Sequence, residues 1–166
     1  MGTFAVNNTR IVAGIRFEDT EVDSQAFDQD GNQTTASSDH AFWAPSITIK
    51  HNFDEQLVLR AAIWRSLSRP GFSATAPALE LEIDGDDISG KIGNPELEPY
   101  ESNNFDLALE FYGEGMTFAS AGIFHKDIDN AIYKTIQKDA TINGITFNDG
   151  VATWINADDS TITGLV

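Results

Sequence analysis

The 166-residue chain contains no cysteine, which excludes disulfide frameworks, thiolate metal sites and cysteine nucleophiles. Basic residues are also scarce: 10 stand against 26 acidic residues, and the formal net charge is −16. A surface of this sign repels nucleic-acid phosphates and anionic lipid headgroups. We therefore expect no nucleic-acid partner.

Long hydrophobic runs are missing as well. No apolar stretch approaches the ~18 to 20 residues of a membrane-spanning helix. The sequence contains neither a Gly-x-Ser-x-Gly elbow nor a His-Glu-x-x-His pair, so we expect no enzymatic activity and no cofactor. A transmembrane β-strand needs only ~9 to 11 residues with every second one apolar, so strands remain a possible route across a membrane.

What the chain does contain is repeated alternation of apolar and polar residues, which predicts an all-β fold. The expected strands cover residues 9–18, 42–53, 57–67, 104–112, 116–126 and 131–138. The facing of residues 116–126 is ambiguous, because Ala119, Ala121 and Ile123 compete with Phe118 and Phe124 for one side. A last loop leads to residues 152–156.

The predicted connections alternate between short and long. Residues 19–40 are acidic and polar, with a turn signal at Asp30-Gly31-Asn32, and are expected to form a long mobile loop. Residues 68–103 hold four of the five prolines and form a second loop, with a short ordered piece at 76–81. This asymmetry is typical of outer-membrane barrels, whereas a β-sandwich has more even loops. We predict an antiparallel up-and-down meander of about six strands from a transmembrane barrel.

One pair of motifs joins the two clearest strands. Arg69-Pro70 follows residues 57–67, and Gly93-Asn94-Pro95-Glu96-Leu97-Glu98-Pro99 precedes residues 104–112. Pro45-Ser46-Ile47-Thr48-Ile49-Lys50 and Phe124-His125-Lys126-Asp127-Ile128 are further matches to the same pattern. In this order, the segments resemble the barrel region of TonB-dependent outer-membrane receptors.

The resemblance runs over residues 9–166 and implies that residues 1–166 are a partial barrel without a plug domain. About six strands do not close a barrel that needs ~22. The intact parent would lie in the bacterial outer membrane, contact lipid, and use the TonB complex through its plug. It would import a scarce nutrient: a ferric siderophore, cobalamin or an oligosaccharide.

An open sheet leads to one further structural expectation. Its unpaired edges and its exposed apolar face favour self-association through edge strands. The alternative hypothesis is a soluble all-β binding or adhesion module, which would bury the same face within its own 166 residues. That face is made by Ile11, Ile15, Leu57, Leu59, Ile63, Leu107, Leu109 and Phe111.

The candidate functional residues fall into two groups. The family motif consists of Arg69, Pro70, Gly93, Asn94, Pro95, Leu97 and Pro99. Its simplest role is to fix the turn where the loop re-enters the barrel. Asp84, Asp86 and Asp87 are candidates for calcium binding, but a closing glutamate is missing, so a solvated loop is the favoured interpretation.

Basic and aromatic side chains leave alternatives open. Arg60, Arg65 and Arg69 suit an anionic ligand, although pairing with Asp106 or Glu110 is favoured. Aromatic residues near strand ends fit an interfacial girdle, with sugar stacking as the alternative. These are Trp43, Trp64, Tyr100, Tyr112, Tyr133 and Trp154. The three histidines, His40, His51 and His125, are too scattered for a recognisable metal site.

Overall fold

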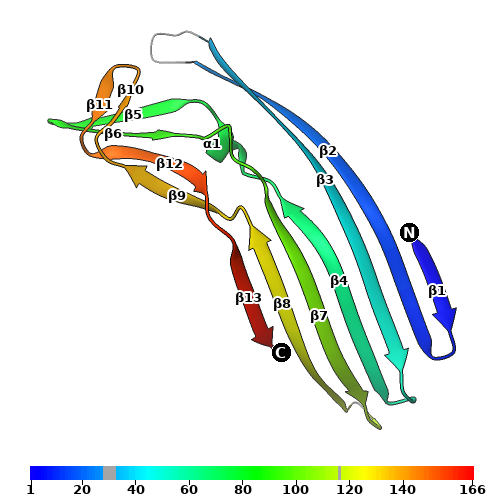
Figure 1. Ribbon diagram of the computed structural model, residues 1–166. Helices are drawn as coiled ribbons and strands as arrows, with labels where there is room; N and C mark the ends of the chain where they lie inside the picture. The colour runs from blue at the N-terminus through cyan, green and yellow to red at the C-terminus, as the bar shows by residue number, and fades with distance from the viewer. Residues whose placement is uncertain (28–32, 116) are drawn as a thin grey trace.

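The computed structural model describes residues 1–27, 33–115 and 117–166. Within them the largest sheet has seven strands in the order β1-β2-β3-β4-β7-β8-β13, each antiparallel to its neighbours (Figure 1). The strands are β1 (Gly2–Val6), β2 (Thr9–Phe27), β3 (Gln33–Asn52), β4 (Leu57–Ser68), β7 (Tyr100–Tyr112), β8 (Phe118–Asp129) and β13 (Ser160–Leu165). The predicted all-β antiparallel fold is confirmed.

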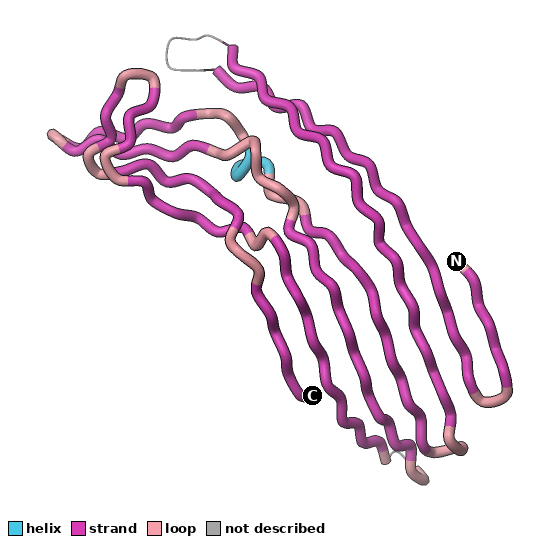
Figure 2. The backbone as a smooth tube through the Cα atoms, in the orientation of Figure 1, coloured by secondary structure: helices cyan, strands magenta, loops and turns pink. Residues whose placement is uncertain are grey.

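Short turns join the strands at one end of this sheet, and long connections leave from the other (Figure 2). The long connections contain one short helix, α1 (Phe72–Thr75). No helix in the described part of the chain is long and apolar enough to cross a membrane.

Two long connections fold together into a second sheet. It contains β5 (Leu79–Asp84), β6 (Asp87–Ile92), β12 (Gly150–Asn156) and β9 (Ile132–Gln137), in that spatial order. β6 lies between β4 and β7 in the chain, β12 lies between β8 and β13, and the two pair in parallel. A hairpin of β10 (Ala140–Ile142) and β11 (Ile145–Phe147) places the fully buried Phe147 beside this sheet. We call residues 71–99 and 131–159 the loop unit.

The prediction of a mobile loop over residues 19–40 is wrong for its described part. β2 and β3 continue through this region, with pairs from Asp19 with Ala41 to Phe27 with Gln33. The segment lacks the apolar residues of a core, and the backbone bonds between the two strands extend the hairpin through it instead. The turn signal Asp30-Gly31-Asn32 lies outside the described residues.

The expectations for the other connections also need correction. Residues 68–103 are not mainly loop, because they contain β5 and β6 as well as the start of β7. β9 pairs with β12 rather than with β8, and β1 and β13 were not predicted. Pairing between distant connections depends on contacts that local alternation does not reveal, which explains these differences.

One row of directly paired apolar residues crosses all seven strands of the large sheet. It contains Phe4, Ile11, Ile49, Ala61, Leu107, Ile123 and Leu165. Paired residues project to the same side of a sheet, so this row defines an apolar face. Ala119, Ala121 and Ile123 belong to it, which resolves the ambiguous facing of β8. β1 and β13 are the two edges, and self-association through them stays a prediction.

Candidate functional site: a groove on the polar face

The opposite, polar face carries a concavity with a volume of about 1130 Å³. It lies between the outer half of the β2–β3 hairpin and the segments around Pro70 and Pro95. Hydroxyl, imidazole and carboxylate groups line it from the hairpin side, whereas prolines line it from the other side. The lining includes Thr20, Ser38, His40, Arg69, Glu96 and Pro99. We call this concavity the groove.

The groove begins where β3 and β4 separate. Their paired residues end at Ser46 and Trp64, although both strands continue beyond that point. Pro45, which has no N–H to donate, is the next residue of β3. Side chains bridge the gap instead of backbone bonds, so the wall of the groove depends on side-chain chemistry.

Arg69 forms one of these bridges. Its Nη2 donates to Glu18 Oε2 at 2.6 Å and to Thr20 Oγ1 at 2.8 Å, both on β2. Arg65 forms another: it donates to Glu101, and its guanidinium lies 5.0 Å from the centre of the Phe42 ring. The hairpin is therefore tied to the strands beyond the gap by two arginines.

The second predicted motif segment, around Asn94, ties the loop unit together. Asn94 Nδ2 donates to the Trp154 carbonyl at 3.1 Å, and the Asn94 backbone N–H donates to the Ala74 carbonyl at 2.6 Å. Leu97 is buried beside it, with 5% of its surface exposed. Asn94, Pro95, Leu97 and Pro99 also line the groove. In addition to the predicted turn, the motif therefore makes a long-range contact, from Asn94 to Trp154.

An asparagine pair closes the base of the loop unit, and the sequence analysis missed it. Asn156 Oδ1 accepts from the Glu98 N–H at 3.0 Å, while Asn156 Nδ2 donates to the carbonyls of Glu98 and Asn130, both at 2.9 Å. Asn130 Nδ2 in turn donates to Glu98 Oε2 at 2.9 Å. A carboxamide suits this junction because it both donates and accepts. Asn130 adopts a left-handed backbone conformation, with a φ of 59°. An asparagine between two predicted strands was the sequence feature that could have indicated a turn at this position.

A family model described as TonB dependent receptor-like, beta-barrel matches residues 1–165. The chain belongs to this family. A comparison with curated protein sequences finds no match.

Solved structures of TonB-dependent receptors share the fold of this receptor barrel segment. The siderophore receptor PirA from Pseudomonas aeruginosa aligns with 95% of the chain at a TM-score of 0.64 and 18% identity. The Serratia marcescens hemophore receptor HasR, bound to HasA and heme, also aligns over 95%, with a TM-score of 0.60 and 17% identity. The ferric enterobactin receptor PfeA from Pseudomonas aeruginosa aligns with 95% of the chain at a TM-score of 0.58 and 18% identity. The chain covers 30%, 27% and 24% of these three structures, respectively.

Within this receptor barrel segment, the arginines form ion pairs, as the favoured interpretation predicted. Arg60 Nε donates to both carboxylate oxygens of Glu110 at 2.9 Å, which confirms the pairing of Arg60. Arg65 and Arg69 pair instead with Glu101 and Glu18, neither of which was among the predicted partners.

A row of like charges crosses the polar face near the short turns. Arg10, Lys50 and Arg60 lie directly opposite one another on β2, β3 and β4. Like charges in directly opposed positions destabilise a sheet. Glu110 offsets part of this repulsion through its bonds to Arg60. The strongly acidic chain therefore presents a locally basic strip on this face.

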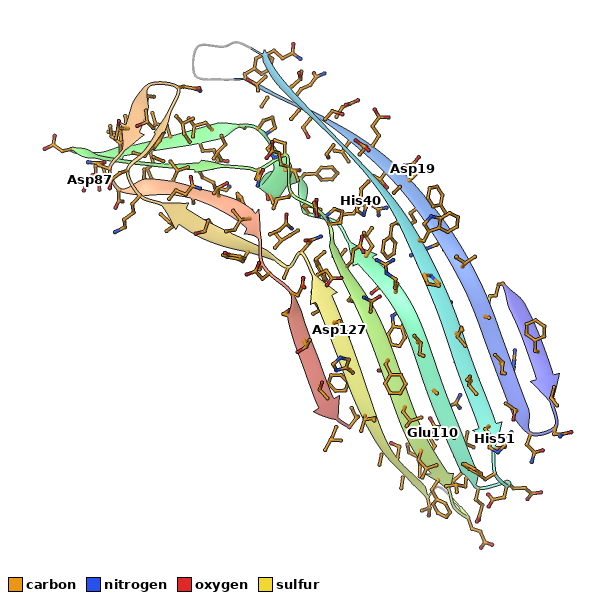
Figure 3. All side chains as sticks on the ribbon, viewed as in Figure 1. Asp19, His40, His51, Asp87, Glu110 and Asp127 are labelled. Carbon is orange, nitrogen blue, oxygen red and sulfur yellow. The ribbon has the colours of Figure 1, made fainter. Side chains whose placement is uncertain are left out.

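The calcium candidates lie together at one exposed hairpin turn. Asp84 and Asp87 end the exposed β5–β6 hairpin, and Asp87 lies at its far end, remote from the other labelled side chains (Figure 3). Among the described residues, no group of three or more carboxylate, imidazole or thiol side chains is placed to hold a metal ion. A solvated hairpin end remains the favoured interpretation.

The histidines are dispersed along the sheet, as Figure 3 shows for His40 and His51. The His51 ring nitrogen Nδ1 lies 2.8 Å from Thr9 Oγ1. His125 lies 2.7 Å from Thr163 and 3.0 Å from Asp127. Each of these two rings therefore has polar neighbours that account for its position.

Aromatic pairs lie towards the two ends of the large sheet, one on each face. Phe17 and Trp43 stack on the apolar face with ring centres 4.6 Å apart, and Asp19 follows on the same face of β2. Tyr112 and Phe118 pair at the short-turn end with centres 5.2 Å apart. Trp64 projects from the polar face instead, so the predicted girdle residues do not all share one face.

Replacing Arg69 with alanine should loosen the outer half of the β2–β3 hairpin, because it removes both bonds to β2. The pair is partly exposed, so we expect a cost of only about 0.5 to 1 kcal/mol. Hydrogen exchange of residues 18–27 and 33–42 measures the effect. Arg16→Ala is the matched control: Arg16 also contacts Glu18, at 2.7 Å, but does not reach across the gap. Equal protection in both variants would contradict the bridging role.

Proposed function

We propose that this chain is part of a bacterial outer-membrane receptor that takes up a scarce small-molecule nutrient with energy from the TonB system. Membership of the family supports the transport role. A binding and transport role, rather than catalysis, also agrees with the absence of hydrolase motifs from the sequence.

The observation that carries the proposal is the uncovered apolar face. Ile15 is 65% exposed and Ile63 is 58% exposed, although both belong to long, regular strands. A soluble module would bury such residues, because each large aliphatic side chain gains about 1.5 to 3 kcal/mol on burial. No element in the described ranges packs over this face. Lipid hydrocarbon is the solvent that suits it.

The polar face and groove support a role in admitting a ligand. Both the groove and the loop unit lie at the long-connection end, which in outer-membrane barrels faces the outside. The similar structures are a siderophore receptor, a hemophore receptor in complex with its hemophore and heme, and a ferric enterobactin receptor. We propose a ferric siderophore as the first candidate cargo, with cobalamin and oligosaccharides as alternatives.

Tryptophan fluorescence tests the placement in lipid. Two single-tryptophan variants keep either Trp43, on the apolar face, or Trp64, on the polar face, with phenylalanine at the other two tryptophan positions. After reconstitution into bilayers that contain brominated phospholipid, we expect strong quenching of Trp43 and little quenching of Trp64. The same variants in bilayers without bromine give the reference intensities. Equal quenching of the two residues would overturn the proposed orientation.

A further inference from the structure

A second cavity, of about 570 Å³, lies where the large sheet meets the loop unit. Residues from the end of β8, the start of β9, the segment before α1 and β12 contribute to its lining. Its volume falls within the usual range for small-molecule sites. Most of its wall is apolar. The apolar contributions come from Pro70, Ala74, Ile128, Ala131, Ile132 and Trp154.

Two lysines lie beside the ring of Trp154, and one of them, Lys134, also lines the cavity. The ammonium group of Lys134 lies 5.8 Å from the centre of the Trp154 ring, and that of Lys91 lies 5.7 Å from the same centre. The aromatic face attracts each cation, but two cations at one ring repel each other. Three neighbouring strands hold the arrangement in place, because Trp154 pairs with Lys134, and Ala152 pairs with Lys91.

The counter-charges in this area are incomplete. Glu80 lies 3.5 Å from Lys91, at the limit of a direct contact. Lys134, which itself lines the cavity, has no carboxylate partner in the part of the chain that the structure describes. The guanidinium of Arg69, which also borders the cavity, is occupied by Glu18. An exposed cation with no carboxylate partner among the described residues therefore lies beside the aromatic ring that borders the cavity.

We propose that this cavity is a binding subsite for an organic anion with a flat apolar body. The anionic group would pair with Lys134, and the flat body would contact Trp154 and the aliphatic wall. The hydroxyls of Ser73 and Ser160 and the ring of Tyr100 complete the polar part of the lining. A neutral sugar would leave the lysine charges uncompensated, so the site favours an anion. This inference rests on the proposed uptake function and specifies its ligand chemistry.

Calorimetric titration with a matched pair of probes tests the subsite. Naphthalene-2-carboxylate carries the charge and the flat ring, whereas naphthalene-2-carboxamide has the same ring without charge. With the protein in non-ionic detergent, we expect the carboxylate to bind about tenfold more tightly than the amide. Lys134→Gln should remove this preference, and Lys134→Arg should retain it. Lys138→Gln is the control, because Lys138 follows the same strand but does not line the cavity.

Three results would overturn the subsite: no detectable binding of the carboxylate, equal binding of both probes, or an equal loss in the Lys134→Gln and Lys138→Gln variants. Trp154→Leu should weaken both probes, since it removes the flat surface that they share. These outcomes are separable from the uptake proposal. If Trp43 is quenched by brominated lipid while the carboxylate fails to bind, the membrane placement stands and only the anion subsite falls.

Discussion

Replacing Gly93 with alanine should destabilise the loop unit by about 3 kcal/mol, the upper end of the usual cost of overpacking. A Cβ at this position would lie 2.7 Å from the Ala76 amide nitrogen, closer still to the Ala76 carbonyl oxygen, and 3.0 Å from the Ala74 carbonyl oxygen. All three are backbone atoms, so no side-chain rotation relieves the clash. The adjacent bond from the Asn94 N–H to Ala74 would be displaced as well.

Hydrogen exchange resolved by segment measures this effect. In the Gly93→Ala variant, amides of β6 and β12 should exchange faster, whereas those of β4 and β7 should keep their protection. Gly71→Ala is the matched control, because a Cβ at residue 71 meets no atom within 4 Å. If Gly71→Ala and Gly93→Ala behave alike, close packing at Gly93 does not hold the unit together.

Truncating Phe147 to alanine should have an effect of similar size, about 3 to 5 kcal/mol on the loop unit. Phe147 is fully buried, with 0% of its surface exposed, and Val151 beside it in the loop unit is 1% exposed. The truncation leaves a cavity against β6. Phe72→Ala is the control, since Phe72 is 82% exposed and its removal should change stability little.

The absence of a side chain at Gly90 makes room for the Phe147 ring, and a double-mutant cycle tests this complementarity. A Cβ on residue 90 would lie 2.7 Å from Phe147 Cε1. Gly90→Ala should therefore be costly alone and less costly in the Phe147→Ala background, with coupling above ~0.5 kcal/mol. Protection of β6 and β12 amides gives the free energies. Strictly additive effects would show that the two positions do not share one space.

Much of the large sheet was predictable, because the alternation of apolar and polar residues that indicates a strand lies within a short stretch of sequence. β4 and β7 lie where alternation placed them, since a pleated strand sends successive side chains to opposite faces. The same alternation predicted which of their residues share a face. It failed for residues 19–40, where polar and acidic side chains on both faces hide a strand from any test based on hydrophobicity.

The candidate site was only partly predictable. Its motif residues Arg69 and Asn94 stood out in the sequence, but their contacts with Glu18 and Trp154 did not. The Arg69–Glu18 pair spans 51 residues and the Asn94–Trp154 bond spans 60, so no local pattern joins them. For the same reason, the convergence of Lys91 and Lys134 on Trp154 was not foreseen.

The sequence by itself determined the strands with clear alternation, such as β4 and β7, their two-sided character and the family, because alternation and the proline-rich motifs are properties of short stretches. Only the tertiary structure decided that β6 and β12 pair in parallel and that two long connections form one folded unit. It also decided where charge collects: acidic residues end the β5–β6 hairpin, while Arg10, Lys50 and Arg60 form a basic strip on the polar face. Such patterns arise from register between distant strands, and register is set by the assembled sheet.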